Sequence, residues 1–338
     1  MAELLKQLTE TAGVSGDEGR VRKLITERIS PLVDNVQTDR MGNLIAYKKG
    51  KKSDKKIMLC AHMDEIGLIV TGIQEEGMLK FKTIGGIDPR ILVSKRVLVG
   101  EKGCPGVLGI KAIHLQEVEE RQSAVKVKQM YIDIGAASRE EAAQAVSLGD
   151  YAVFDSRYIE FGENKVKAKA LDDRAGCAIL VELMKQEYDY DIYACFSVQE
   201  EVGLRGAEVL GYGLNPDIAI VVEGTTCSDV PDVDQHQYTT EMGKGPAITI
   251  MDGSSYANKE LVEMLVKTAY REGISFQFKK GTTGGNDAGR LHLAREGIKT
   301  ATVSVPCRYI HSPASVMDLD DYSNTIRLLS CFLKGCEL

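Results

Sequence analysis

The sequence predicts an α/β protein in which helices flank a mixed, mostly parallel sheet and a small β-rich domain is inserted. Two observations lead to this fold class. Short apolar runs alternate with segments of helical periodicity along most of the chain, which is the order typical of parallel sheets. A middle stretch breaks this order, because it contains short strands, many glycines and one helical segment. With 338 residues, the chain has room for about two domains of roughly 150 residues each.

The flanking parts contain the strands of the predicted sheet and the helices between them. Apolar runs predict buried strands at residues 57–61, 192–198, 217–222, 247–251 and 300–305. Between several of these strands, apolar residues recur at helical spacing, notably over 174–186 and 259–271. Near the N-terminus the same spacing predicts a helix over 15–30, and Ser15 with Glu18 fits a capping box at its start.

The middle stretch, residues 67–161, is predicted to be the inserted domain. Its first part is expected to form a β-hairpin with a turn near Gly77. Further along, Ser138 begins a capping-box sequence that opens one short helix. Residues 1–66 and 162–338 would then form one discontinuous α/β domain, since domain insertions favour surface loops.

Composition and charge exclude several classes of protein. The chain has 42 Lys and Arg against 49 Asp and Glu, a net charge of −7, whereas proteins that bind a phosphate backbone carry a basic patch. No stretch approaches the roughly 18 consecutive apolar residues of a membrane span. The first twenty residues are charged throughout, so we expect no secretory signal. The eight cysteines form no C-x-x-C pair, and we expect reduced, structural thiols in a cytoplasmic protein.

Side chains that can bind metals or move protons lie at the ends of predicted strands in five places. The segments are CAHMDEIG with His62 and Asp64, ALDDRAG with Asp172 and Asp173, SVQEEVG with Glu200 and Glu201, VVEGTT with Glu223, and RYIHSP with His311. In open α/β sheets, ligands bind beyond the carboxyl ends of the strands, so these segments can converge on one crevice. Singly, each is typical of an ordinary residue, such as a helix N-cap or a solvated pair. Together they favour a shared site.

The chemistry of these residues favours a metal-dependent hydrolase. Two histidines with several carboxylates suit Zn²⁺, Co²⁺ or Mn²⁺. Two such ions about 3.5–4 Å apart need a carboxylate able to bridge them, and they lower the pKa of a bound water to about 7. A free carboxylate beside that water can take its proton. Because side chains alternate along an extended strand end, Glu200 and Glu201 are predicted to point opposite ways, one as base and one as ligand.

The five segments that carry the candidate site residues, together with GGIDPR, GVLGIKAIH, DIGAASREEA and TGGNDAG, resemble segments of a known family and occur in the same order. The chain is similar over about residues 1–330 to the di-metal aminopeptidases of the glutamyl-aminopeptidase and tetrahedral-aminopeptidase type, metallopeptidase family M42. The resemblance implies a zinc-peptidase-like catalytic domain at 1–66 and 162–338, and an insert at 67–161 used in oligomer contacts. It implies a cytoplasmic exopeptidase that removes N-terminal residues from short peptides and forms a homo-oligomer, a dodecamer or smaller.

The resemblance also implies a role for each site residue. Each metal would have three protein ligands and the two would share one of them: His62, Asp172 and Glu223 for the first, Asp172, Glu201 and His311 for the second. Glu200 would be the general base for a hydroxide bridging the metals, and Asp64 would orient His62 through its other ring nitrogen. Asp173 receives no ligand role. Position 223 is Glu where the family often has Asp, which leaves the choice among Zn, Co and Mn open.

Further residues are candidates for the surroundings of the site. Gly284, Gly285, Asn286 and Asp287 of the TGGNDAG segment, and Arg308, would shape the substrate site. His114 is expected to be structural, since Ala112-Ile113 precede it where the family usually has proline.

Three other functions remain in competition with this one. A di-metal carboxypeptidase or amidohydrolase would share the metal ligands but recognise a substrate carboxylate, and it usually lacks the insert. A glycosidase also uses paired carboxylates, but the chain has no Trp and only 6% aromatic residues for stacking on sugars. A non-catalytic scaffold that binds metal would leave Glu200 without a purpose. The preferred N-terminal residue is not determined by the sequence.

Overall fold

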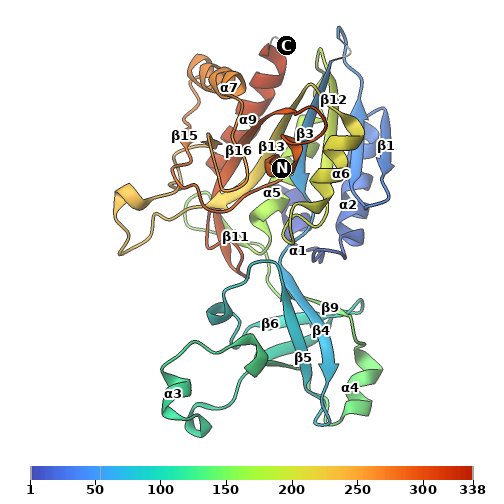
Figure 1. Cartoon of the computed structure of the whole chain (residues 1–338), viewed down its shortest axis with the longest axis vertical. Coiled ribbons are helices and arrows are strands. Elements are labelled where there is room, and N and C mark those ends of the chain that lie inside the picture. The colour runs from blue at the N-terminus through green and yellow to red at the C-terminus, as the bar shows by residue number, and fades with distance from the viewer. Residues whose placement is uncertain (1, 54, 337–338) are drawn as a thin grey trace.

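The structure, a computed structural model, describes residues 2–53 and 55–336 and consists of two parts (Figure 1). One part is a large sheet covered by helices, and the other is a closed β-barrel. The chain leaves the sheet after β3 (Lys56–His62), forms the barrel from β4 (Gly67–Ile73) to β9 (Tyr151–Phe154), and returns at β10 (Ile159–Phe161). The barrel therefore lies next to the carboxyl end of β3, below the sheet in Figure 1.

The large sheet is mixed, with parallel strands at its centre and antiparallel strands towards its edges. The strands β12, β3, β13 and β16 pair in parallel, whereas β2 and β17 run antiparallel to their neighbours. The order is β1 (Asn35–Thr38), β2 (Leu44–Lys48), β12 (Asp191–Ser197), β3, β13 (Ile218–Thr226), β16 (Lys299–Arg308), β17 (Ser315–Asp318), β11 (Lys165–Ala168) and β10, with β14 (Ala247–Thr249) and β15 (Gln277–Phe278) beside β16. The predicted fold class is confirmed, and each predicted strand is present.

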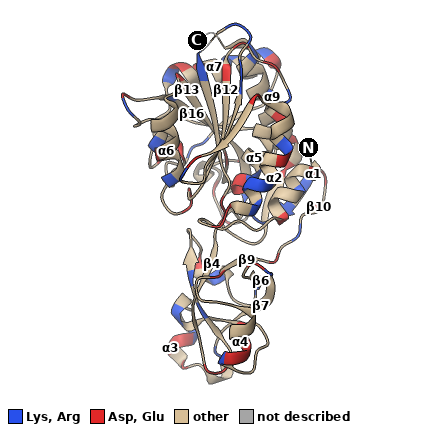
Figure 2. Cartoon of the chain, turned by 90° about the vertical axis from the view of Figure 1, so that its right-hand side faces the viewer, with Lys and Arg blue, Asp and Glu red and all other residues tan. Residues whose placement is uncertain are grey.

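Helices cover both faces of the sheet, which is seen along its edge in Figure 2. One face carries α1 (Ala2–Glu10), α2 (Gly19–Ile29), α5 (Leu171–Leu183), α7 (Lys259–Glu272) and α9 (Leu319–Gly335), and the other carries α6 (Arg205–Leu214) and α8 (Ala288–Leu291). Strand β3 packs on both layers, because Ile57, Leu59 and Ala61 face the first and Met58 and Cys60 face the second. A strand buried on both faces is apolar throughout, which made it visible in the sequence. Single 3₁₀ turns lie at Ser30–Leu32, Pro89–Ile91, Ile113–Leu115, Val127–Gln129 and Gln235–Gln237.

The barrel has a hydrophobic core of its own. Its strands close in the order β4, β5 (Leu79–Ile84), β8 (Tyr131–Asp133), β7 (Cys104–Gly109), β6 (Arg96–Val99) and β9, with the helices α3 (Val118–Arg121) and α4 (Arg139–Ala145) outside. The predicted hairpin is β4–β5, and Gly77 in its turn has a φ of 84°. Ser138 is the N-cap of α4 and accepts a hydrogen bond from the Glu141 backbone N–H. The reciprocal half of the predicted capping box is absent, because the Glu141 side chain accepts from the Ala137 N–H instead. The use of 67–161 in oligomer contacts stays a prediction.

The helix predicted at 15–30 begins later, and the capping box predicted for it is wrong. Helix α2 begins at Gly19 with Glu18 as its N-cap residue, and no side chain caps it. The Ser15 hydroxyl instead donates to Asp64 Oδ2 at 2.6 Å. Glu18 Oε1 accepts from the Gly16 backbone N–H at 2.7 Å. The Ser15 hydroxyl, which the local sequence predicts to cap a helix, therefore binds the buried carboxylate of Asp64 just after β3.

The surface and the cysteines have no unusual features. Acidic and basic residues are interspersed on the helices of both parts (Figure 2). Among the residues that the structure describes, no helix combines the length and apolar character needed to cross a bilayer. All eight cysteines are free, and most are buried.

Candidate active site

The carboxyl ends of the parallel strands bring the predicted site residues into one cavity. This cavity has a volume of about 730 Å³, and residues at the carboxyl ends of β3 and β16 line it together with Gly86 of the barrel. Its wall contains residues from the end of β3, the first turn of α5, the loop after β12, strand β13 and the loop after β16: His62, Asp172, Glu200, Glu201, Glu223 and His311. Side chains separated by up to about 250 positions in sequence are therefore neighbours in space.

His62 is held in one orientation and faces three carboxylates. Its Nδ1 lies 3.1 Å from the backbone oxygen of Asp64, which can only accept, so Nδ1 carries the proton of this bond. Its Nε2 faces Asp172 Oδ1 at 3.3 Å, Glu223 Oε2 at 3.8 Å and Glu200 Oε2 at 4.0 Å. The ring is almost completely buried, with 1% exposed. In its neutral form, His62 therefore presents a lone pair to the carboxylates.

His311 repeats this arrangement on the other side of Asp172. Its Nδ1 donates to the backbone oxygen of Gly86 at 2.9 Å. Its Nε2 faces Glu201 Oε2 at 3.4 Å and Asp172 Oδ2 at 3.6 Å. Asp172 thus directs one carboxylate oxygen towards each histidine, which is the position that a bridging ligand requires.

The residues present fit two divalent cations. Two ligand atoms at about 2.0–2.1 Å from a tetrahedral metal are about 3.3 Å apart. In this site, His62 Nε2 lies 3.3 Å from the Asp172 oxygen and 3.8 Å from the Glu223 oxygen that it faces. Lone pairs that face carboxylates need a proton or a cation between them. Glu223 Oε1 is buried without a hydrogen-bond partner, as expected of an oxygen that would bind a metal ion.

The electrostatics of the site also favour the binding of cations. Burial raises the pKa of Glu200 and of Glu223 well above the usual range for Glu. Burial likewise raises the pKa of Glu201 to about 7, although the charge of His311 opposes this shift. Within the described residues, the ion pairs of these carboxylates and of Asp172 involve only the two histidines. Several carboxylates with no Lys or Arg partner are stabilised in their charged form by metal ions.

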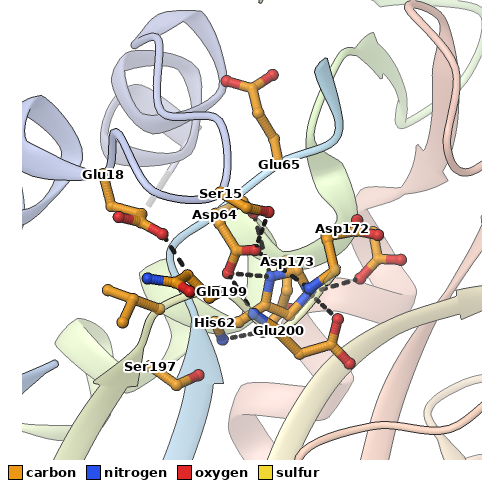
Figure 3. Close-up of polar contacts among 12 residues, drawn as sticks. Ser15, Glu18, His62, Asp64, Glu65, Asp172, Asp173, Ser197, Gln199 and Glu200 are labelled. Atoms are coloured by element: carbon orange, nitrogen blue, oxygen red, sulfur yellow. Dashed lines mark hydrogen bonds and ion pairs between the residues drawn. The ribbon is translucent and has the colours of Figure 1, made fainter. Parts of the chain in front are cut away.

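Asp64 connects the site to the N-terminal segment, as Figure 3 shows. Its buried carboxylate accepts hydrogen bonds from the Ser15 hydroxyl at 2.6 Å, the Glu200 N–H at 3.0 Å and the Glu201 N–H at 3.1 Å. Glu18 adds a bond from the Gln199 N–H at 3.1 Å. Asp64 therefore fixes both His62 and the backbone of the two glutamates. Sequence reasoning missed Ser15, because a serine four residues before a helix gives the ordinary signal of a cap.

Glu200 and Glu201 do not point opposite ways, so that prediction is wrong. Both side chains line the same cavity. The reason is that the chain is no longer extended after β12 ends at Ser197, since Gln199 has a φ of 56°. The alternation of a strand does not continue into such a turn.

Asp173 is close to the proposed ligands but already has hydrogen-bond partners. Its Oδ2 accepts from the His62 backbone N–H at 3.1 Å and its Oδ1 from the Gly176 N–H at 2.9 Å. Its carboxylate lies within ligand distance of the side chains of His62 and Glu223, yet it does not line the cavity. This geometry supports a role in holding β3 against α5 rather than in binding metal.

The remaining predicted residues divide into two groups. Gly284, Gly285 and Asn286 line the cavity, as expected for a substrate-shaping loop. Asp287 and Arg308 are not among the residues that line it: Asp287 is buried, and Arg308 forms a two-pronged ion pair with Asp229 at 2.8 and 2.7 Å.

Two further side chains complete the comparison with the sequence predictions. His114 is exposed in a 3₁₀ turn of the barrel, so its expected structural role is not supported. Lys279, which the sequence analysis did not single out, lines the cavity. No local pattern distinguishes it from the many lysines on the surface.

Comparison with known proteins identifies the family. The family described as "M42 glutamyl aminopeptidase" matches residues 42–328. The chain belongs to the M42 peptidase family. It is therefore a hydrolase of the aminopeptidase type, and the resemblance recognised in the sequence is confirmed.

Relatives of this M42 peptidase match it over nearly their whole length. A putative aminopeptidase of Acetivibrio thermocellus is 42% identical over 331 residues, which cover 97% of each chain. The lysyl aminopeptidase of Pyrococcus furiosus is 35% identical over 340 residues, covering 98% of this chain and 96% of its own. Among solved structures, the TET1 peptidase of Pyrococcus horikoshii, which can assemble into a tetrahedron or a large octahedral shell, is 35% identical with a TM-score of 0.88 and 99% of each chain covered.

Proposed function

We propose that this M42 peptidase is a two-metal aminopeptidase that removes N-terminal residues from short peptides, with Glu200 as its general base. The observation that carries the proposal is the position of Asp172, whose two carboxylate oxygens face the Nε2 atoms of His62 and His311 at 3.3 and 3.6 Å. A carboxylate between two imidazoles held in this way is suited to bridge two cations.

Five side chains would hold the two ions, three for each with one shared: His62, Asp172 and Glu223 for the first, and Asp172, Glu201 and His311 for the second. When bound, Zn²⁺, Co²⁺ or Mn²⁺ would polarise the scissile carbonyl and make a water acidic enough to react at neutral pH. In their neutral form both imidazoles suit this role, because both Nδ1 atoms donate to backbone oxygens and leave Nε2 free to bind a cation.

Glu200 is the group in this cavity best placed to transfer protons. Its Oε2 lies 4.0 Å from His62 Nε2, next to the atoms that would hold the first ion. Burial raises the pKa of Glu200 well above the usual range for Glu, which makes its carboxylate a stronger base than an exposed one for taking a proton from water and later giving it to the leaving amine. The backbone N–H of Glu200 is bound by Asp64, so the base is fixed relative to His62.

The state of assembly and the compartment are part of the same proposal. We expect a homo-oligomer, a dodecamer or smaller, because the similar TET1 peptidase forms closed shells. Residues 67–161 would serve in these contacts, apart from β10, which pairs in the large sheet, and 1–66 with 162–338 would form the catalytic domain. A cytoplasmic location agrees with eight free cysteines, since thiols persist in reducing compartments.

The test uses metal-depleted protein reloaded with Zn²⁺, Co²⁺ or Mn²⁺ and a panel of peptides with free or acetylated N-termini. We expect stepwise loss of N-terminal residues, read as product masses, from the free peptides only. Glu200→Gln should abolish turnover while both ions remain bound. Cleavage from the C-terminus would favour the carboxypeptidase alternative, removal of the acetyl group alone would favour the deacylase, and no metal-dependent cleavage would favour the scaffold.

A further inference from the structure

We propose that Gly86, which lies in the barrel loop between β5 and β6, is a positioning residue for His311 and so sets the affinity of the second metal site. This inference rests on the two-metal centre proposed above. It makes the two ions unequal: the first is held by the sheet part alone, and the second depends on where the barrel places one backbone carbonyl.

The two histidines differ in what orients them. His62 stands at the end of β3, is 1% exposed, and donates its Nδ1 proton to Asp64, two residues along the same chain segment. His311 is 35% exposed on its side chain and lies three residues after β16 with a φ of 56°. Its Nδ1 proton goes to Gly86 O, which is 225 positions away in sequence. The ring of His311 therefore takes its direction from a different part of the fold.

The loop approaches the second site so closely that added side chains would crowd the proposed ligands. A Cβ added to Gly86 would lie 3.3 Å from His311 Nδ1. A Cβ added to Gly85 would lie 2.6 Å from Ile66 Cγ2 and 3.3 Å from Glu201 Oε2. Both glycines thus lie against ligands of the second proposed ion, Glu201 and His311. Neither His62 nor Glu223 is among the atoms nearest to a Cβ added at either glycine.

The position of Gly86 is set by the barrel. Gly85 directly follows β5, and the next turn is fixed by Asp88, whose carboxylate accepts from the Arg90 N–H at 2.9 Å. On the other side, Ile66 precedes β4 and contacts the barrel core. A shift of the barrel relative to the sheet would move Gly86 O, and the ring of His311 would follow it.

The expected effect follows from how outer hydrogen bonds act on metal ligands. Loss or displacement of the partner of a ligating histidine typically lowers metal affinity by about 10–100-fold. Gly86→Ala should therefore weaken the second equivalent of metal by about this factor. The first equivalent should bind as in the wild type, because His62, Asp172 and Glu223 are untouched.

The experiment is a Co²⁺ titration of the metal-free protein, followed by the visible absorption of the bound ion. Gly86→Ala is compared with Gly72→Ala, a control in β4 of the same barrel where the added Cβ would be at an ordinary 3.5 Å from Lys80 Cβ. Thermal unfolding of each metal-free variant checks that the fold is intact. If Gly86→Ala does not fold, Asp88→Ala serves instead, because it loosens the same loop at an exposed position without adding an atom near His311.

Selective weakening of the second equivalent in Gly86→Ala, with Gly72→Ala unchanged, would support the proposal. Equal weakening of both equivalents, or no change in the second, would overturn it. A wild-type protein that binds fewer than two ions would overturn the two-metal centre and this inference with it. A wild-type protein that binds two ions but cleaves no peptide would overturn the proposed function alone, since the titration does not depend on activity.

Discussion

Removing the Ser15 hydroxyl should weaken both the fold and the catalysis, although Ser15 touches neither metal ligand nor cavity. In Ser15→Ala, Asp64 loses a hydrogen bond of 2.6 Å between two buried groups. A bond to a charged group contributes about 1.5–3 kcal/mol. The N–H groups of Glu200 and Glu201 still bind Asp64 in this variant. We therefore expect the free energy of unfolding to fall by about 2 kcal/mol, which is less than the cost of leaving a buried charge unpaired.

The assay for Ser15→Ala is urea unfolding of the metal-free protein together with peptide kinetics of the metal-loaded protein. The control is Ser30→Ala, whose hydroxyl bonds to Thr26 O at an exposed position and should contribute far less. We expect kcat to fall with little change in KM, since Asp64 orients His62 and Glu200 rather than the peptide. Equal stability and equal kcat in Ser15→Ala and the wild type would refute the reasoning.

The pH dependence of this stability difference has a definite sign. Burial raises the pKa of Asp64, but the hydrogen bonds from His62 and Ser15 outweigh burial, so its pKa lies below the usual value. A lowered pKa contributes stability that is present above the unfolded value of about 3.9 and is lost as pH falls through the folded pKa. The gap between wild type and Ser15→Ala should therefore be full at neutral pH and shrink in acid.

Three further predictions concern other parts of the molecule. Glu201 has a pKa raised by burial to about 7, so the metal must displace its proton and Co²⁺ affinity should fall as pH drops from about 8 to about 6; a flat profile in the same titration would contradict this. Lys279 lines the cavity, so peptides with an acidic N-terminal residue should be cleaved faster than basic ones, and Lys279→Glu should reverse that ranking; an unchanged ranking would place the lysine away from the bound side chain. Glu65 pairs with buried Lys169 and Arg174 at 2.7 and 3.3 Å, so Glu65→Gln should lower the free energy of unfolding by about 3–5 kcal/mol in urea, and a loss below about 1 kcal/mol, the value of a surface pair, would show the network to be unimportant.

Much of the sheet was predictable because burial leaves a local pattern. Strands such as β3 are covered on both faces, so every residue from Ile57 to Ala61 is apolar. The site residues could be grouped for a related reason, since parallel strands must end on one edge and His62, Glu223 and His311 lie in or after such strands. The family resemblance then assigned roles that spacing alone left open.

Local patterns failed where the chain leaves regular structure. Ser15 and Glu18 matched a helix cap, yet α2 begins at Gly19 and both side chains bind elsewhere. Glu200 and Glu201 were expected to diverge, yet the turn at Gln199 directs both into the cavity. In each case a contact with a distant segment decided the conformation, and a distant segment leaves no trace in the neighbouring residues.

The sequence by itself therefore determined the fold class, the family and the set of side chains that we propose as metal ligands. Only the tertiary structure decided how those side chains are oriented. Asp64 takes a hydroxyl from 49 positions away, and His311 takes its direction from a backbone oxygen 225 positions away. The sequence cannot identify the carbonyl that binds His311, because every peptide unit carries the same carbonyl group. Only the packing of the fold determines which one reaches the ring.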